Sequence, residues 1–251
     1  MKRTGTTLMA TGLVIIGLTG LSACGFLSSS STTTSSAASP VSEEIPEPPL
    51  LLGPPVPLPA PSSETTGDLS IVLDQRHSTR VFGDTPLTEE QLATLLWATY
   101  GLQTDGGRTV PSAGGIYSLT IFVVAGEVDG LSSGVYAWDP LTNELGPTVE
   151  GDMREELQIA ALDQDSVGAA PAVIVIAGSP TRMAERYGAR AEQFTLNEVG
   201  HAGQNLQLMA ASMNLGSVIV GGFTEEQVST VLHLPSGEIP YYLVPMGVPG
   251  E

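Results

Sequence analysis

Cysteine and lysine are almost absent from this chain of 251 residues, and histidine is rare. Cys24 is the single cysteine, which excludes an intrachain disulfide and a cysteine-ligated metal site. The three histidines, at positions 77, 201 and 233, are too scattered to form a metal site, so we expect no metal. Lys2 is the only lysine, and 27 acidic residues against 9 basic ones give a formal net charge of −18. Such a surface disfavours nucleic acid and anionic lipid headgroups as partners.

The first 24 residues have the pattern of an export signal. Lys2 and Arg3 form a positive start, an apolar stretch follows at residues 8–18, and small residues lead into Cys24. The apolar stretch is too short to span a membrane comfortably. The pattern predicts a lipoprotein signal peptide over residues 1–24 with lipid attached to Cys24, and an ordinary signal peptide ending near a cysteine is the alternative. We therefore expect an extracytoplasmic protein, anchored to the cell membrane by lipid.

Composition changes after the signal. Residues 25–67 are rich in serine and threonine and then in proline, with residues 50–52 as the one concentrated apolar patch. This composition predicts a disordered tether that becomes extended around residues 54–61. The remainder, residues 68–251, is about 180 residues long, which is enough for one domain with a substantial core.

Helical and strand patterns alternate irregularly along residues 68–251. Apolar spacing and capping residues predict a helix that begins after Thr88, and further helices over residues 68–75, 152–162, 194–214 and 224–232. Strands are expected at residues 119–125, 135–138, 172–177, 217–220 and 241–244. Helices that flank a mixed central sheet without regular strand–helix alternation indicate an α+β fold.

Residues 76–80 carry two arginines around a serine. Arg76 and Arg80 flank Ser78, and a guanidinium pairs bidentately with phosphate oxygens. The segment therefore suits a phosphate monoester. The alternative is an exposed helix end at which arginines complement the helix dipole.

Two further segments carry glycines that would let the backbone approach a flat ligand. Residues 108–117 form a Pro/Gly loop whose glycines permit close approach to a ring, unless it is a plain turn. Gly221 and Gly222 end a strand that follows the long, small-residue-rich helix. Without side chains at these positions, the backbone N–H groups are open to a ligand. The alternative is that the two glycines form a structural bulge.

In this order and at these separations, the three segments resemble the FMN-dependent nitroreductase superfamily, and most of all its SagB/ThcOx-type branch, whose best-known members oxidise azolines in peptide natural products. The resemblance covers about residues 68–249. It implies a nitroreductase-like fold and a homodimer that binds FMN at the subunit interface, with each flavin touching both chains. The residues that it identifies as cofactor contacts are Arg76, His77, Ser78, Arg80, Arg108, Pro111, Ser112, Ala113, Gly114, Gln204, Asn205, Gly221 and Gly222.

Two departures from the family bear on the substrate and the phosphate site. Azoline dehydrogenases carry a Lys-Tyr pair upstream of the long helix that assists proton removal, and Arg186-Tyr187 match it here. Arginine stays protonated and cannot readily act as a base, so Tyr187 is the candidate catalytic residue. The chain also ends at Glu251 without the basic extension of many nitroreductases, and Arg108 is expected to compensate.

These features lead to two functional hypotheses. The first is an FMN-dependent oxidoreductase that transfers hydride equivalents between a small-molecule or peptide substrate and an acceptor, with the flavin positioned and tuned by the protein. The superfamily suggests NAD(P)H as donor, whereas oxygen, a quinone or a secreted carrier would suit a site outside the cytoplasm. The second is a lipoprotein that keeps the fold as a binding module and captures a flavin or planar aromatic without turnover.

Overall fold

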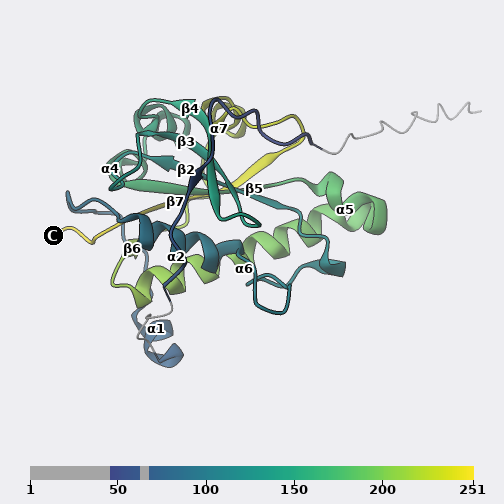
Figure 1. Ribbon diagram of the computed structural model, residues 1–251, viewed down its shortest axis with the longest axis horizontal. Helices are drawn as coiled ribbons and strands as arrows, with labels where there is room; N and C mark the ends of the chain where they lie inside the picture. The colour runs from purple at the N-terminus through teal and green to yellow at the C-terminus, as the bar shows by residue number, and fades with distance from the viewer. Residues whose placement is uncertain (1–45, 63–67) are drawn as a thin grey trace, which may run out of the picture. The chain divides into compact units, whose positions relative to one another are not determined.

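Two apolar strands, β2 (Leu119–Ala125) and β5 (Ala172–Gly178), form the centre of a seven-stranded sheet (Figure 1). The computed structural model describes residues 46–62 and 68–251, so the predicted signal and Cys24 lie outside the described residues. The strand order is β1-β4-β3-β2-β5-β7-β6. The remaining strands are β1 (Val56–Pro57), β3 (Gly134–Asp139), β4 (Glu144–Glu150), β6 (Gly216–Ser217) and β7 (Ile239–Gly247).

Both faces of the sheet are covered. Because side chains alternate along a strand, Ile121 and Ile174 belong to one hydrophobic core, whereas Phe122 and Val173 belong to the other. The α+β prediction is confirmed, but the named strands all pair antiparallel instead of forming a mixed sheet. A continuous apolar run shows that a strand is buried on both faces and carries no information on the direction of its neighbours.

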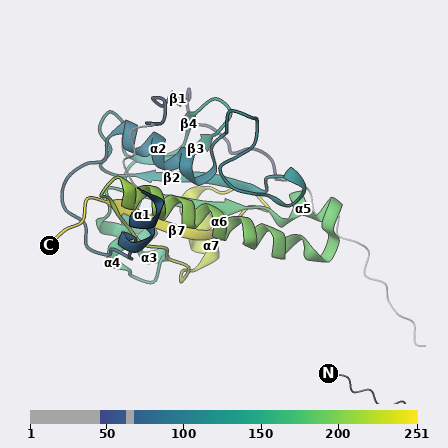
Figure 2. The same ribbon diagram turned by 90° about the horizontal axis from the view of Figure 1, so that it is seen from below.

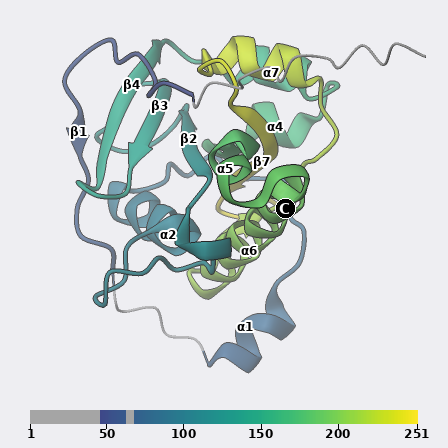
Figure 3. The same cartoon turned by 90° about the vertical axis from the view of Figure 1, so that its right-hand side faces the viewer.

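Helices form a layer on each side of the sheet (Figures 1 and 3). The first core packs against α2 (Glu89–Tyr100) and α6 (Ala191–Ser212). The second packs against α3 (Arg154–Ala160), α4 (Asp165–Ala169) and α7 (Glu225–Leu232). Two more helices contact α6: α1 (Leu69–Gln75), which lies across its C-terminal half in Figure 2, and α5 (Pro180–Tyr187) near its start.

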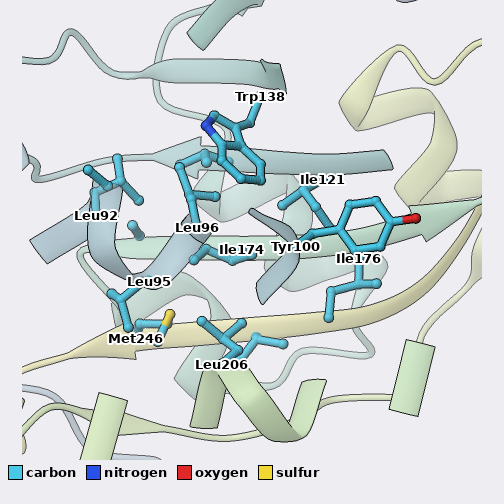
Figure 4. Close-up of a cluster of buried hydrophobic side chains, with 14 of the residues drawn as sticks. Leu92, Leu95, Leu96, Tyr100, Ile121, Trp138, Ile174, Ile176, Leu206 and Met246 are labelled. Carbon is cyan, nitrogen blue, oxygen red and sulfur yellow. The ribbon is translucent and has the colours of Figure 1, made fainter. Parts of the chain in front are cut away.

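Helix α2 forms as its sequence predicts. The Thr88 hydroxyl accepts the Gln91 N–H, and the Gln91 side chain accepts the Thr88 N–H, which completes a capping box. Leu92, Leu95 and Leu96 are fully buried. Figure 4 shows them in the same cluster as the Tyr100 ring, whose hydroxyl points away from the leucines. One turn beyond the core leucines, α2 therefore carries a polar atom out of the hydrophobic cluster.

Residues 46–62 differ from the tether predicted over residues 25–67. Val56 pairs with Leu145 of β4, and the Leu52 N–H donates to the Pro147 carbonyl at 2.7 Å. Leu58 is buried. The segment therefore lies along the edge of the sheet and joins the domain well before residue 68. Proline-rich composition indicates extended backbone, and proline is also tolerated in a strand at the edge of a sheet.

Element boundaries differ from the predictions where local backbone ends an element. The predicted helix 152–162 is shorter because Leu162 and Asp163 adopt positive φ angles. The predicted strand 217–220 is shorter in the structure, where it corresponds to β6. Beyond β6, Val220 pairs with Leu243 as an isolated bridge. Thr224 precedes α7 without making a side-chain cap hydrogen bond. Among the α-helices and strands of the described residues, four were not predicted, namely β1, β4, α4 and α5.

Over residues 46–62 and 68–251, no helix combines the length and apolar character needed to cross a membrane. The same residues contain no cluster of three or more acidic, histidine or cysteine side chains able to hold a metal ion.

Candidate functional site

Residues 76–80, here called the arginine turn, follow α1 and lie against β6. The Thr79 N–H donates to the Ser217 carbonyl at 2.9 Å, and Ser78 pairs with Ser217 as an isolated parallel bridge. A Cβ atom on Gly216 would stand 2.6 Å from the Thr79 side chain, so only glycine lets the turn approach this closely. The backbone of the arginine turn is therefore positioned by the segment that leads to Gly221 and Gly222.

The charged groups of the arginine turn have no acidic partner. Among the described residues, ion pairs are made by Arg154 and Arg182 alone, whereas Arg76 and Arg80 form none. Arg76 is half-buried, and Ser78 and Arg80 are exposed. In a chain with 27 acidic residues, two guanidiniums that flank one serine in the sequence and make no ion pair among the described residues have the chemistry to bind an anion.

His77 contributes to the same region through a local contact. Its Nδ1–H donates to the Gln75 carbonyl at 2.8 Å, which assigns the ring tautomer because a carbonyl can only accept. The ring lies on the wall of a cavity of about 250 Å³. Other residues that line this cavity are Thr79, Gln207, Asn214 and Ser217.

Gly221 and Gly222 are exposed, and neither steric contact within the described chain nor backbone conformation requires glycine at these positions. Val220 exchanges two backbone hydrogen bonds with Leu243, which holds the segment in place up to the first glycine. A Cβ on Gly222 would meet nothing within 4 Å, and one on Gly221 would reach Tyr242 only at 3.8 Å. Neither residue has a positive φ. The absence of side chains therefore leaves room for something outside the chain, which favours a ligand over a structural bulge.

The loop of residues 108–117, here called the Ser112 loop, is held by a buried carboxylate that the sequence prediction did not place in the site. The Ser112 hydroxyl donates to Glu198 Oε2 at 2.6 Å and accepts the Tyr117 N–H at 2.9 Å. Glu198 lies on α6 with no exposed surface, and it also accepts the Ser118 N–H and the Tyr100 hydroxyl. The four contacts join the end of α2, the loop and α6 into one network.

Burial controls the ionisation of this network. Removal from water raises the pKa of Glu198, although the hydrogen bonds from Ser112, Tyr100 and Ser118 oppose the rise. Burial, followed by the nearby Glu198 charge, raises the pKa of Tyr100 far above its ordinary value, so its hydroxyl remains a donor.

We expect this raised pKa to make stability depend on pH. A carboxyl with a higher pKa in the folded state binds its proton more tightly when folded. The free energy of unfolding therefore falls as pH rises from the ordinary carboxyl range through the raised pKa of Glu198. Glu198→Gln resembles the protonated carboxyl and cannot titrate, so its unfolding free energy should lack this decline. Urea unfolding of both proteins from pH 4 to 8 measures the difference, and parallel curves would contradict it.

Gly114 brings the tip of the Ser112 loop against Tyr187. Its φ is +63°, and a Cβ there would stand 2.7 Å from Arg186 Nη1 and 2.8 Å from the Tyr187 hydroxyl. The half-buried Tyr187 ring packs on Phe194 with centroids 4.6 Å apart. The predicted loop residues Pro111, Ser112, Ala113 and Gly114 and the predicted catalytic Tyr187 are therefore brought together in one chain.

Gly114→Ala and Gly115→Ala form a matched pair that separates close contact from backbone strain. Both glycines have positive φ, but a Cβ on Gly115 would meet nothing within 4 Å. We expect Gly115→Ala to cost about 1 kcal/mol of unfolding free energy through φ alone, and Gly114→Ala to cost about 1 kcal/mol more through the contact with Tyr187. Chemical denaturation measures both. Equal losses would show that the loop tip does not touch Arg186 and Tyr187.

Arg108 and Asn205 occupy different places from the arginine turn. Arg108 Nη1 donates to the Tyr100 carbonyl at 2.9 Å, and its guanidinium lies 4.5 Å from the centroid of the Tyr100 ring. Asn205 Nδ2 donates to the Thr109 carbonyl at 2.9 Å, so it supports the Ser112 loop. Gln204 is exposed on α6. In one chain, Arg108 is therefore not brought beside Arg76 and Arg80.

The predicted residues thus form two groups along α6. The arginine turn and the segment leading to Gly221 and Gly222 lie near β6 and the C-terminal half of the helix. The Ser112 loop and Tyr187 lie beside its N-terminal half (Figure 1). The two groups therefore lie beside different parts of the same helix.

Comparison with known proteins identifies the family. The model of the nitroreductase family matches residues 73–248. The chain belongs to the nitroreductase family. A relative from Methanocaldococcus jannaschii, whose name places it among the nitroreductases, is 38% identical over 180 residues, covering 71% of this chain and 90% of its own.

Comparison with solved structures shows the same fold. A structure from Ralstonia eutropha, also a nitroreductase by name, has a TM-score of 0.70 at 29% identity and covers 83% of this chain and 96% of its own. The NADPH:FMN oxidoreductase from Vibrio harveyi, solved with NAD+, has a TM-score of 0.54 at 22% identity over 73% of this chain and 70% of its own. The latter likeness is one of fold. Together, the family and its relatives identify this protein as an oxidoreductase.

Proposed function

We propose that this nitroreductase-family protein depends on FMN and transfers hydride equivalents between an organic substrate and an acceptor. The observation that carries the proposal is the arginine turn, in which Arg76 and Arg80 flank the exposed Ser78 and have no acidic partner within residues 46–62 and 68–251. Two guanidiniums and a hydroxyl suit the terminal phosphate of FMN. The Thr79 N–H fixes the backbone of the turn against β6, from which these side chains project.

The neighbouring backbone fits the flat part of the same cofactor. Gly221 and Gly222 are exposed and lack an internal reason to be glycine, so their backbone is free to approach a ring. Bound FMN would supply the group that accepts and donates hydride. The protein's own residues would bind the phosphate, orient the ring and, at the Tyr187 hydroxyl, hold a proton near the loop tip formed by Gly114.

We further propose a homodimer, because one chain separates the two groups of site residues along α6. A partner would bring its Ser112 loop to the arginine turn of the first chain. Helix α1 supports this with apolar side chains open to solvent: Leu69 is 63% exposed, Ile71 52% and Leu73 52%. Beside it lies a cavity of about 360 Å³ with Trp97 and Met209 in its wall. Association through α1 would bury both, and the mass of the protein in solution measures it.

The finer assignment to the SagB-type branch depends on Tyr187. Its hydroxyl lies beside Gly114, in the Ser112 loop that the resemblance assigns to the flavin. A small-molecule or peptide substrate and a donor such as NAD(P)H complete the proposal. The Vibrio harveyi NADPH:FMN oxidoreductase was solved with NAD+, so a nicotinamide is the first donor to assay here.

For location, we propose that lipid on Cys24 anchors the protein to the cell membrane outside the cytoplasm. The positive start, short apolar stretch and small residues before Cys24 support this proposal. Cys24→Ser should move the protein from the membrane fraction to the soluble extracytoplasmic fraction, and an unchanged distribution would refute the anchor.

The decisive experiment is to express residues 25–251, purify the protein and record its absorption spectrum. We expect a flavin spectrum that bleaches with a reductant and returns in air, and FMN as the chromophore released on denaturation. A colourless protein that fails to take up added FMN would overturn the cofactor assignment. A yellow protein that no donor and acceptor pair can reduce and reoxidise would instead support a binding module without turnover.

A further inference from the structure

A third cavity, of about 330 Å³, lies away from the arginine turn, beneath the N-terminal segment. One wall comes from residues 46–57, here called the proline strap, and the other walls come from the end of α2 and from β2, β3 and β4. Its volume falls at the lower end of the range for small-molecule sites, about 300 to 1,000 Å³. The side chains used below are Leu51, Tyr100, Arg108, Ile121 and Trp138.

The proline strap is attached to the sheet by specific contacts. Val56 pairs with Leu145. Directly after the strap, Asn143 Nδ2 donates to the Leu58 carbonyl at 3.3 Å. A Cβ on Gly146 would stand 2.5 Å from Leu51 Cδ2, so this glycine leaves the space that Leu51 occupies. The strap therefore closes over the strands as a defined wall.

Most of the wall is apolar and rigid. Tyr100 and Trp138 are 1% and 5% exposed, and Ile121 is 1% exposed. Proline and aromatic rings lose little conformational freedom when a ligand packs against them, because their side chains have few rotatable bonds. The cavity is thus suited to a hydrocarbon or aromatic group.

Arg108 is the one cation in this wall, and its charge is not neutralised by the described chain. Nη1 donates to the Tyr100 carbonyl, which leaves the other guanidinium nitrogens without a hydrogen bond in the described residues. The rings of Tyr100 and Tyr117 lie 4.5 and 5.1 Å from Cζ. These contacts orient the guanidinium, which pairs best with a planar carboxylate.

Two acids on the same wall limit the charge of the ligand. Asp139 and Glu144 stand opposite each other on β3 and β4 and both line the cavity. Their charges oppose any anionic group placed near them, so a single carboxylate is expected at Arg108, where it gains a charge-assisted hydrogen bond.

We propose that this cavity binds an apolar monocarboxylate, such as a medium-chain fatty acid, with its carboxylate on Arg108 and its hydrocarbon against Trp138, Ile121 and the proline strap. The site is separate from the arginine turn and does not depend on the flavin. Because the strap forms one wall, the ligand would be enclosed between the N-terminal segment and the sheet.

Isothermal titration of the purified protein, in whatever cofactor state it is isolated, tests the proposal with three ligands of one chain length: decanoate, decanol and decylamine. Decanoate should bind at least tenfold more tightly than decanol, and more tightly than decylamine, whose ammonium group Arg108 repels. Arg108→Gln should weaken decanoate about 10- to 100-fold, in line with the loss of a charge-assisted hydrogen bond, and should leave decanol nearly unchanged. Arg190→Gln, which removes an exposed arginine stacked on Phe194, is the matched control and should change neither ligand.

A second pair of variants tests the cavity without touching Arg108. Leu51 is 41% exposed and lines the cavity, whereas its neighbour Leu50 is 84% exposed and does not. Leu51→Trp should fill the space and reduce decanoate binding at least tenfold, and Leu50→Trp should not. The proposal is overturned if the native protein binds none of the ligands, if Arg108→Gln weakens decanoate and decanol equally, or if Leu51→Trp leaves binding unchanged.

Discussion

Replacing Arg76 and Arg80 together by alanine is expected to weaken FMN binding by about a hundredfold to ten-thousandfold. Each arginine would lose a charge-assisted hydrogen bond to phosphate worth about 1.5–3 kcal/mol, and each 1.4 kcal/mol is a factor of ten in affinity. The loss should shrink at high salt, because phosphate contacts by half-exposed arginines are screened. Quenching of FMN fluorescence on titration into flavin-free protein measures the affinity.

The control separates ligand binding from a merely structural role of the arginines. Because neither arginine has an acidic partner in the part of the chain that the structure describes, the flavin-free double variant should unfold within about 1 kcal/mol of the native protein. Arg190→Ala removes an exposed arginine elsewhere and should leave FMN affinity unchanged. If the double variant binds FMN normally but unfolds more readily, the arginines serve the end of α1 and the phosphate assignment is wrong.

Glu198→Ala is expected to lower the free energy of unfolding by about 3–5 kcal/mol, the largest effect on stability that we predict. The substitution leaves three buried or half-buried donors, on Tyr100, Ser112 and Ser118, without their acceptor. An unsatisfied buried donor costs about 1–3 kcal/mol, and the lost side chain adds a cavity. Urea unfolding monitored by circular dichroism measures the loss.

Two further variants identify the cause of that loss. Glu192→Ala removes an exposed carboxylate from the first turn of the same helix, and it should cost no more than about 0.5 kcal/mol. Glu198→Gln keeps an acceptor in place and should recover most of the stability. A Glu198→Ala protein as stable as the native one would show that Glu198 does not hold the Ser112 loop.

Local patterns predicted much of the fold. The leucines of α2 recur at helical spacing, and Thr88 marks its start, so both were visible in the sequence and are confirmed. The apolar runs of β2 and β5 likewise predicted strands with nearly correct limits. By contrast, β4 contains Gly146 and Pro147, which weaken a strand pattern, and the element was missed. Its pairing with β3 depends on contacts across the sheet that no local pattern records.

The sequence by itself determined the family and indicated the candidate site segments, because arginine, serine and glycine at fixed separations are local features that can be recognised without coordinates. Only the tertiary structure decided that the strands run antiparallel, that residues 46–62 close the sheet edge, and that Glu198 holds Ser112 across 86 positions of the chain. It also decided that Arg108 faces a separate cavity instead of the arginine turn. The physical reason is common to all four: direction, burial and pairing arise from contacts between residues distant in the chain, and periodicity describes only each residue's neighbours along it.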